Sequence, residues 1–249
     1  MKIYGLIGFP LSHSFSKKYF TEKFLKEHVS DCRYENYELN DINELNIVLQ
    51  NNPGLAGINI TIPYKESVME ILDSIDEKAL WIGAVNTVKI TRRNNKIHLK
   101  GFNTDYIGFE KSIINLLKPV HKNALILGTG GASKAIAFVL KNHGIAVTFV
   151  SRQTNEDAIK YEDLSDKIIS EHKIIINCTP LGMVPFIDSF PDIPYKFLSA
   201  QHLLFDLIYN PPETVFLKKG KENGAIIKNG YEMLFLQAEA AWQIWNQLE

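Results

Sequence analysis

The sequence predicts an α/β protein, and three features lead to that prediction. After residue 123, short apolar segments alternate with helical or loop stretches, which is the order of a parallel sheet with connecting segments. One of these segments, residues 124–127, runs into a glycine turn that is followed by an amphipathic helical pattern. The first hundred or so residues add further strands and a hairpin.

The composition excludes several classes of partner. The chain has 249 residues and a formal net charge of -1, and its charges are scattered, so neither a nucleic acid nor a membrane is indicated. Cys32 and Cys178 lie far apart and in no zinc-site or redox pattern, so we expect reduced thiols and no metal. Glycine and proline interrupt the N-terminal segment too early for a signal peptide, and we expect a soluble, cytoplasmic protein.

A serine-rich segment follows the first expected strand, residues 2–7. Ser12, Ser14 and Ser16 flank the start of a helix. One serine there is most simply an N-cap, which stabilises a helix by roughly 1 kcal/mol relative to alanine. Three serines exceed what capping requires, so Ser14 and Ser16 are also candidates to hold a polyol or a carboxylate. His13 is expected to be a local hydrogen-bond partner.

The next strands separate apolar from polar side chains. We expect a strand over residues 34–39, a helix over 43–50 and a strand over 55–62. In the last of these, Asn59 and Thr61 point away from the face that carries the isoleucines. Lys65 follows just after the strand and is a candidate catalytic base or oxyanion partner, although most lysines are merely solvated.

Two Asn-Thr pairs supply the context for that lysine. Asn86-Thr87 opens a hairpin whose turn is expected at residues 92–96, and Asn103-Thr104 stands directly before Asp105. Asp105 is expected to cap a helix over residues 106–117, and the same carboxylate can also serve the site.

The glycine turn is the clearest binding signal. Gly128, Thr129, Gly130 and Gly131 stand between an apolar strand and an amphipathic helix. Glycine lets the backbone approach a diphosphate, and a helix N-terminus adds partial positive charge. The turn therefore predicts a dinucleotide site, and a plain strand-to-helix turn is the weaker interpretation.

The end of the following strand, residues 146–150, indicates which dinucleotide binds. An acid about 20 residues after the glycines would favour NAD, because it would bind the ribose diol. Here Ser151 and Arg152 stand at the tip, and an arginine pairs well with a phosphate, so NADP is favoured. A surface arginine is the alternative, and Glu156 or Asp157 can still curl back toward the ribose.

Strands are also expected over residues 174–177, 203–207 and 225–227. Thr179 is a candidate contact for the nicotinamide ribose or a turn residue, and Met183 is a candidate contact for the ring or a core side chain. Asp206 and Tyr209 stand at the end of the second of these strands, residues 203–207. A long helix is expected over residues 231–248, and Gln237 in it would ordinarily face solvent.

Taken together, these motifs resemble the shikimate dehydrogenase family, the NADP-dependent shikimate 5-dehydrogenases. The similarity spans nearly the whole chain and rests on the following motifs, in order: S-x-S, N-x-T-x-P-x-K, A-V-N-T, N-T-D, G-T-G-G-A-S, N-x-T-P-x-G-M, D-x-x-Y-x-P and G-x-x-M-L-x-x-Q-A. Lys17 stands where the family usually has proline, Thr129 replaces an alanine, and Ser151 replaces an asparagine.

The resemblance implies two domains and a set of site residues. An α/β substrate domain with a mixed sheet would contain residues 1–103 and 234–249, with the last helix returning to it. A Rossmann-like, doubly wound parallel-sheet NADP domain would contain residues 104–233. Lys65 and Asp105 would be catalytic. Shikimate would be bound by Ser14, Ser16, Asn59, Thr61, Asn86, Tyr209 and Gln237. NADP would be bound by Gly128, Thr129, Gly130, Gly131, Ala132, Ser133, Ser151, Arg152, Thr179, Met183, Leu207 and Gly230.

The activity implied is reversible, NADPH-dependent reduction of 3-dehydroshikimate to shikimate, in aromatic amino-acid biosynthesis. A free lysine has a pKa near 10.4, so it suits protonation of an alkoxide. In the reverse direction either unprotonated Lys65 or Asp105 must accept the proton, and the sequence leaves this open. The rivals are an NAD-dependent quinate/shikimate dehydrogenase and a catalytically silent NADP-binding regulator. We expect a monomer or a homodimer.

Overall fold

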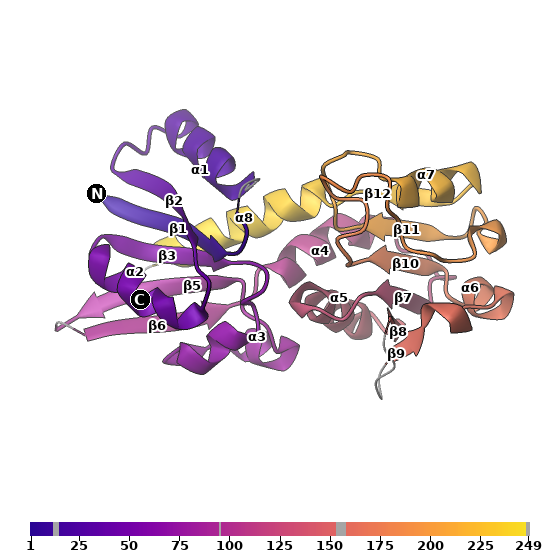
Figure 1. Ribbon diagram of the computed structural model, residues 1–249, viewed down its shortest axis with the longest axis horizontal. Coiled ribbons are helices and arrows are strands. Elements are labelled where there is room, and N and C mark those ends of the chain that lie inside the picture. Colours follow the sequence, from indigo (N-terminus) through magenta and orange to yellow (C-terminus); the bar gives the residue numbers. More distant parts are fainter. Residues whose placement is uncertain (12–14, 95, 153–157, 248–249) are drawn as a thin grey trace. The chain divides into compact units, whose positions relative to one another are not determined.

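The computed structural model describes residues 1–11, 15–94, 96–152 and 158–247 (Figure 1). The chain forms two compact units. Unit 1 contains Met1–Thr104 and Ala238–Glu249, and unit 2 contains Asp105–Gln237. The chain thus leaves unit 1 after Thr104 and re-enters it at Ala238. The boundaries predicted from the sequence were residue 103 and residue 234.

Unit 1 is built on a six-stranded mixed sheet with the strand order β2-β1-β3-β5-β6-β4. Its strands are β1 (Lys2–Gly8), β2 (Cys32–Glu38), β3 (Leu55–Ile60), β4 (Ser74–Ile75), β5 (Thr87–Arg93) and β6 (Lys96–Phe102). β1 pairs in parallel with β2 and β3, β5 pairs antiparallel with β3 and β6, and β4 pairs in parallel with β6. The expectation of a mixed sheet is confirmed.

Helices cover both faces of this sheet because side chains along each strand alternate between the faces. Ile3 and Ile7 of β1 pack with α2 (Leu45–Asn51) and α3 (Glu77–Ile82), together with the short 3-10 turns Ile42–Glu44 and Ser67–Ile71. Tyr4 and Leu6 of the same strand pack with α1 (Phe15–Lys26) and with the C-terminal part of α8 (Tyr231–Asn246). Unit 1 therefore has two hydrophobic layers, one on each face of its sheet.

Unit 2 contains a six-stranded parallel sheet with the strand order β12-β11-β10-β7-β8-β9. Its strands are β7 (Asn123–Leu127), β8 (Ala146–Ser151), β9 (Ala158–Lys160), β10 (Ile174–Asn177), β11 (Leu203–Asp206) and β12 (Ile226–Lys228). When the strands of unit 2 are counted in chain order, this is the doubly wound arrangement of dinucleotide-binding folds, so that prediction is confirmed.

Unit 2 is also covered on both faces. One layer joins α4 (Asp105–Ile113) and α5 (Gly131–Asn142) to one side of the sheet through Phe109, Ile136 and Leu140. The other joins α6 (Asp166–Glu171) and α7 (Val215–Glu222) to the opposite side through Ile169, Phe216 and Leu217. The carboxyl ends of the parallel strands remain for loops, which is where such sheets bind ligands.

The structure corrects several expected boundaries. β3 ends at Ile60 rather than at residue 62, and Ile62 is 69% exposed instead of sharing the core face. Asp105 is the first residue of α4 and is buried, whereas it was expected to stand just before the helix as a cap. α4 ends at Ile113 and is extended by a 3-10 turn, Ile114–Leu116.

Candidate active site

A chain of buried hydrogen bonds runs through the polar side of unit 1. Asn59 on β3 is 5% exposed, and its Oδ1 accepts a hydrogen bond of 2.8 Å from the Tyr34 hydroxyl. Its Nδ2 donates to the Asn86 carbonyl oxygen at 3.3 Å and to Thr87 Oγ1 at 3.2 Å. The amide predicted for substrate contact is therefore held by three neighbours of the same unit.

Asn86 is held in a fixed orientation by Thr104 of the second Asn-Thr pair and by its neighbour Thr87. Its Oδ1 accepts 2.6 Å and 3.1 Å hydrogen bonds from the backbone N–H and the hydroxyl of Thr104. The Thr87 hydroxyl donates to the same oxygen at 3.1 Å. A backbone N–H can only donate, so the amide atom facing it must be the oxygen. Asn86 is 3% exposed, and these contacts set which way its amide points.

The other expected residues of unit 1 lie on neighbouring segments. Lys65 is half-buried, and its carbonyl oxygen accepts a 2.7 Å hydrogen bond from the backbone N–H of Val85, the residue before Asn86. Thr61 follows β3, and its N–H donates to the Ile7 carbonyl at 2.9 Å. Ser16 is the second residue of α1, and Ser14 lies outside the described residues. The structure thus gathers Asn59, Asn86 and the Lys65 backbone around two strand ends.

Unit 2 carries the remaining expected residues. Asp105 and Gln237 are buried, 6% and 9% exposed respectively. They lie on packed helices, because a Cβ atom on Gly108 of α4 would stand 3.1 Å from the Cβ of Gln237 on α8. Glycine at position 108 therefore permits close packing one turn after Asp105. Tyr209 follows β11, and burial raises the pKa of its hydroxyl.

The glycine turn has the geometry that a phosphate site needs. Gly128 has φ of +100°, a left-handed conformation that favours glycine. Gly130 is the extended residue before α5, and a Cβ there would meet nothing within 4 Å, so the space over the helix start is open. Gly130 is the N-cap residue of α5 and has no side chain with which to cap the helix, so the first amides of α5 have the arrangement that binds anions.

Two of the expected cofactor residues make local bonds. The Ser133 hydroxyl, on a residue that is 1% exposed, donates to the Gly130 carbonyl at 2.6 Å. The Thr179 hydroxyl donates to Asn177 Oδ1 at 2.6 Å, and the Thr179 N–H donates to the same oxygen at 3.0 Å. Both side chains therefore shape their turns, which is the turn interpretation expected for Thr179.

Arg152 lies beside the glycine turn. β7 and β8 are parallel with Leu127 opposite Val150, so the residues after each strand emerge next to one another. The Gly128 N–H donates to the Val150 carbonyl at 2.8 Å, so the glycine turn is hydrogen-bonded to the end of β8. Arg152 is exposed one residue after the end of β8, while residues 153–157, with Glu156 and Asp157, lie outside the described part of the chain.

The loop after β10 presents apolar side chains at the surface. Met183 is 48% exposed, which excludes the core role considered for it. Gly230 is buried. Its N–H donates to the Ile208 carbonyl at 3.1 Å, and a Cβ there would collide with the Leu207 backbone. Leu207 and Gly230, both expected near the cofactor, are thus neighbours in unit 2.

Asp206, at the end of β11 and the first residue of the D-x-x-Y-x-P motif, is a buried acid. It is fully buried, and burial raises its pKa from 3.8 to about 6. Hydrogen bonds from the Thr214 hydroxyl (2.6 Å), the Ile208 N–H (3.0 Å) and Asn177 Nδ2 (3.1 Å) oppose that rise. Its role is to tie the loops after β10 and β11 together.

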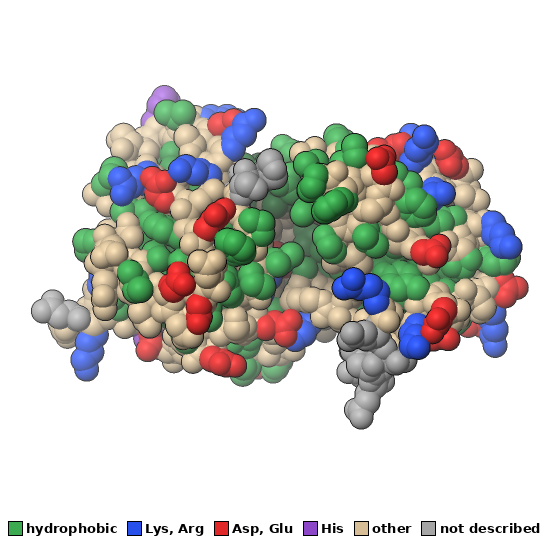
Figure 2. All heavy atoms as spheres, in the orientation of Figure 1, with side chains coloured by type: hydrophobic (Ala, Val, Ile, Leu, Met, Phe, Trp, Pro, Cys, Tyr) green, Lys and Arg blue, Asp and Glu red, His purple; other side chains and the backbone are tan. Residues whose placement is uncertain are grey.

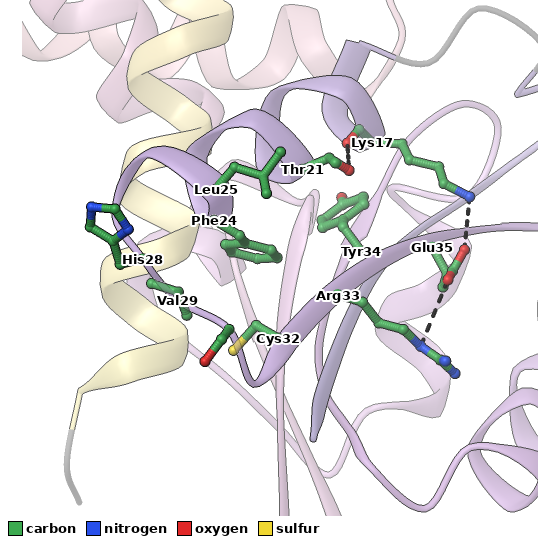
Figure 3. A pocket seen from close by; sticks show the side chains of 11 residues that line it. Lys17, Thr21, Phe24, Leu25, His28, Val29, Cys32, Arg33, Tyr34 and Glu35 are labelled. Carbon is green, nitrogen blue, oxygen red and sulfur yellow. Dashed lines mark hydrogen bonds and ion pairs between the residues drawn. The ribbon is translucent and has the colours of Figure 1, made fainter.

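A surface cavity of about 690 Å³ lies on unit 1 between α1 and β2 (Figure 3). Lys17, Thr21 and Phe24 line it from the helix, and Arg33, Tyr34 and Glu35 line it from the strand. Glu35 forms ion pairs with Lys17 at 2.8 Å and with Arg33 at 3.7 Å. None of the predicted site residues within the described ranges lines this cavity, so its volume does not mark the candidate site.

Sequence reasoning missed Tyr34 and the bonding roles of Thr87 and Thr104. Tyr34 lies in a strand whose pattern suggested only packing, and the contact that matters comes from Asn59, a residue 25 positions away. The two threonines were noted as members of Asn-Thr pairs. The repeated pairing of asparagine with threonine at two strand ends was the available signal.

Three further features concern the surface charge, the helices and the possible metal ligands of the described residues. Lysine, arginine and acidic side chains are interspersed over the face drawn in Figure 2. No helix in the described ranges is long and apolar enough to cross a membrane. Within those ranges there is also no group of three or more His, Cys, Asp or Glu residues placed to hold a metal ion.

The chain is similar to proteins of known activity. The family model "Shikimate dehydrogenase substrate binding domain" matches residues 6–88. A shikimate dehydrogenase (NADP(+)) of Clostridium beijerinckii is 42% identical over 100% of this chain and 93% of its own length.

Solved structures match over the full chain. Shikimate dehydrogenase 1 of Peptoclostridium difficile has a TM-score of 0.85 at 37% identity, covering 100% of this chain and 94% of that one. The Thermus thermophilus shikimate 5-dehydrogenase in complex with NADP(H) and shikimate has a TM-score of 0.85 at 28% identity, with the same coverage. A quinate dehydrogenase of Corynebacterium glutamicum in complex with NAD also reaches 0.85, at 26% identity and the same coverage. Overall fold alone therefore does not separate these activities.

Proposed function

The chain belongs to the shikimate dehydrogenase family, and we propose that it catalyses the reversible reduction of 3-dehydroshikimate to shikimate with NADPH. It is an NADP-dependent oxidoreductase acting on a CH–OH group. The observation that carries the proposal for this chain is the convergence of Asn59, Asn86 and the Lys65 segment in unit 1. A polyol substrate needs such fixed donors and acceptors, because its hydroxyls are recognised by hydrogen bonds.

The residues of unit 2 fit an NADP cofactor. The open space over Gly130, the left-handed Gly128 and the N-terminus of α5 suit a diphosphate. Arg152, exposed beside that turn, suits the phosphate on the ribose, since guanidinium groups bind phosphate in a bidentate manner. Thr179, Met183, Leu207 and Gly230 complete the proposed cofactor set. When bound, NADPH supplies a hydride to the ketone carbon.

Lys65 is the proposed acid for ketone reduction. As the carbonyl carbon gains the hydride, its oxygen becomes an alkoxide that takes a proton from the lysine ammonium, leaving a neutral amine and the alcohol. Asp105 is the second proposed catalytic residue. In the oxidation direction either unprotonated Lys65 or Asp105 accepts the proton of the substrate hydroxyl. Ser14, Ser16, Asn59, Thr61, Asn86, Tyr209 and Gln237 are the proposed substrate-binding residues.

Replacing Lys65 tests this assignment. In Lys65→Ala we expect kcat to fall by about 10²–10⁴-fold with a much smaller change in the KM for shikimate, because general acid–base groups contribute at that scale. Lys26→Ala, at an exposed position in the last turn of α1, is the control. Wild-type turnover in Lys65→Ala would remove Lys65 from the mechanism, and a rise in KM alone would make it a binding residue.

One assay separates the rival functions. The absorbance of NADPH or NADH is followed with shikimate, quinate or 3-dehydroshikimate as the second substrate. Preference for NADP and shikimate supports the proposal, and preference for NAD with quinate supports the nearest alternative. An absence of turnover with every pair would favour a silent cofactor-binding regulator. A cytoplasmic location and a monomeric or homodimeric state are part of the proposal.

A further inference from the structure

Tyr34 is a buried tyrosine on the edge strand of unit 1. It is 2% exposed and lies on β2, one of the two edge strands of the sheet. Its ring stacks on Phe20 of α1 with the centroids 4.6 Å apart and the planes 9° from parallel. Figure 3 shows the ring between α1 and β2. Packing alone would be served equally well by phenylalanine, so the hydroxyl needs its own explanation.

The hydrogen bonds around Asn59 define the direction in which the Tyr34 hydroxyl acts. Asn59 faces the Asn86 carbonyl at 3.3 Å, and a carbonyl only accepts, so the amide atom there must be Nδ2. Oδ1 therefore faces Tyr34, and the Tyr34 hydroxyl must be the donor across the 2.8 Å contact. An amide in the opposite orientation would place an oxygen against an oxygen and an NH₂ against the hydroxyl.

The same series of hydrogen bonds continues to Asn86. Asn59 Nδ2 donates to Thr87 Oγ1 at 3.2 Å, and Thr87 donates to Asn86 Oδ1 at 3.1 Å. Thr104 Oγ1 lies 3.2 Å from Thr87 Oγ1 and also bonds Asn86 Oδ1. The donors and acceptors thus follow one another from β2 across β3 to β5, all within unit 1.

The Ser16 side chain also hydrogen-bonds Tyr34, at the start of this series of hydrogen bonds. Burial raises the pKa of the Tyr34 hydroxyl, and hydrogen bonding by the Ser16 side chain opposes that rise. Because Tyr34 gives its only proton to Asn59, Ser16 acts as a donor toward it in this arrangement. Tyr34 thus interacts with two residues, Ser16 and Asn59, that are both proposed to bind substrate.

We infer that Tyr34 is a positioning residue that orients the Asn59 amide, and with Thr87 the Asn86 amide, for recognition of a polyhydroxylated substrate. The inference rests on the proposed function of unit 1. Removing the Tyr34 hydroxyl leaves Asn59 Oδ1 buried with one donor fewer, so the amide loses one of the contacts that hold it in place. Substrate affinity falls while the cofactor residues of unit 2 keep their own contacts.

The test compares two tyrosines on the same strand. Tyr34→Phe keeps the ring and its stacking, and we expect the KM for shikimate to rise by about tenfold with the KM for NADP+ within about twofold of wild type. Tyr37→Phe is the matched control, because Tyr37 also lies on β2 and donates to an asparagine, Asn52 Oδ1, at 3.3 Å. Tyr37→Phe should leave both KM values within about twofold of wild type.

A second pair of variants keeps the inference testable if Tyr34→Phe folds poorly. Thr87→Val removes the hydroxyl and should raise the KM for shikimate, whereas Thr87→Ser keeps it and should restore a KM near that of wild type. In the double variant Tyr34→Phe/Thr87→Val, the two increases should combine to less than their product, because both act on one chain of bonds.

Each outcome has one meaning. A wild-type KM in Tyr34→Phe, or an equal rise in Tyr37→Phe, would overturn the positioning role. A fully multiplicative effect in the double variant would show that Tyr34 and Thr87 act separately, which also overturns it. If wild-type protein itself does not turn over shikimate with NADP+, the proposed function fails, and that result is obtained before any variant is compared.

Discussion

At the scale of single residues, buried polar groups define the chemistry of both units. In unit 1 the amides of Asn59 and Asn86 are oriented by donors and acceptors whose direction is unambiguous. In unit 2 His202 is fully buried, and its Nδ1 accepts from the Ser199 N–H at 3.0 Å while its Nε2 donates to the Ile169 carbonyl at 3.0 Å. Burial lowers the pKa of His202, so its neutral form is favoured.

Asp206 gives a prediction about pH. Its folded-state pKa of about 6 lies above the usual 3.8, so between these values the folded protein binds more protons than the unfolded chain. Stability from this group therefore falls as pH rises from about 4 to about 6, by about 2–3 kcal/mol. Asp206→Asn should remove that decrease, because the amide oxygen still accepts and its NH₂ can donate to the Thr214 hydroxyl.

The measurement is urea unfolding of wild type and Asp206→Asn at several pH values between 4 and 7. The difference in unfolding free energy between the two proteins should grow as pH rises, in favour of the variant. His202 works in the opposite sense, since a lowered pKa costs stability as pH falls below its ordinary value, and it contributes equally to both proteins. A difference that does not vary with pH would show that Asp206 ionises normally.

At the scale of elements, α1 is tied to α8 within unit 1 by a buried lysine. The Lys23 side chain is 8% exposed and lies 2.9 Å from Glu239 of α8 and 2.6 Å from Glu27. Tyr19 also hydrogen-bonds Glu239. Burial alone would lower the pKa of Lys23, but these two carboxylates outweigh burial and raise it.

Removing Glu239 should therefore be costly. Glu239→Ala leaves a buried ammonium and the Tyr19 hydroxyl with fewer acceptors, and we expect a loss of about 2–3 kcal/mol in the free energy of unfolding. Glu22→Ala is the control, because the Lys18–Glu22 pair is exposed and such pairs contribute about 0–1 kcal/mol. Denaturant unfolding measures both, and equal losses would contradict a special role for the buried pair.

An element could be predicted from the sequence when the residues that determine it lie close together along the chain. β10 has the predicted bounds, because its apolar run is marked by polar residues on both sides. β4 contains two residues and β9 three, too few for a periodic pattern, and their pairing partners lie elsewhere in the chain. Thr214 is the N-cap residue of α7, and its hydroxyl also donates to Asp206, a contact that sequence spacing does not reveal.

The same distinction applies to the site. Motifs with fixed spacing, such as the glycine turn and the Asn-Thr pairs, could be read directly from the chain. The hydroxyl of Tyr34 could not, because its function depends on which strand becomes the neighbour of β1 and on the register of that pairing. Ser133 and Thr179 show the converse, since their bonds to Gly130 and Asn177 serve local turns.

At the scale of the whole molecule, the proposed substrate-binding and cofactor-binding residues lie mostly in different units, each with its own core. Unit 1 carries the oriented amides and Lys65, and unit 2 carries the glycine turn and Arg152. Each ligand that binds only the folded chain stabilises it by RT ln(1 + [L]/Kd), which is about 2.7 kcal/mol at one hundred times Kd. NADP+ and shikimate should therefore each raise the thermal midpoint of wild-type protein.

Arg152 allows the cofactor part of this statement to be tested. In Arg152→Ser we expect the shift produced by NADP+ to shrink and the KM for NADP+ to rise by about tenfold or more, because a charged hydrogen-bonded phosphate contact is lost. The shift produced by NAD+ should stay as in wild type. Differential scanning fluorimetry with each cofactor measures both, and an equal loss for NAD+ would show that Arg152 does not recognise the extra phosphate.

The last helix also has a consequence for how the chain matures. Trp245 lies close against Gly57, where any Cβ would collide with the indole, and its Nε1 donates to the Val88 carbonyl at 3.0 Å. Unit 2 is one uninterrupted stretch, Asp105–Gln237, whereas unit 1 needs residues from both ends of the chain. On the ribosome, unit 2 has its whole sequence available first. The aromatic layer of unit 1 is completed only after its final helix has left the exit tunnel.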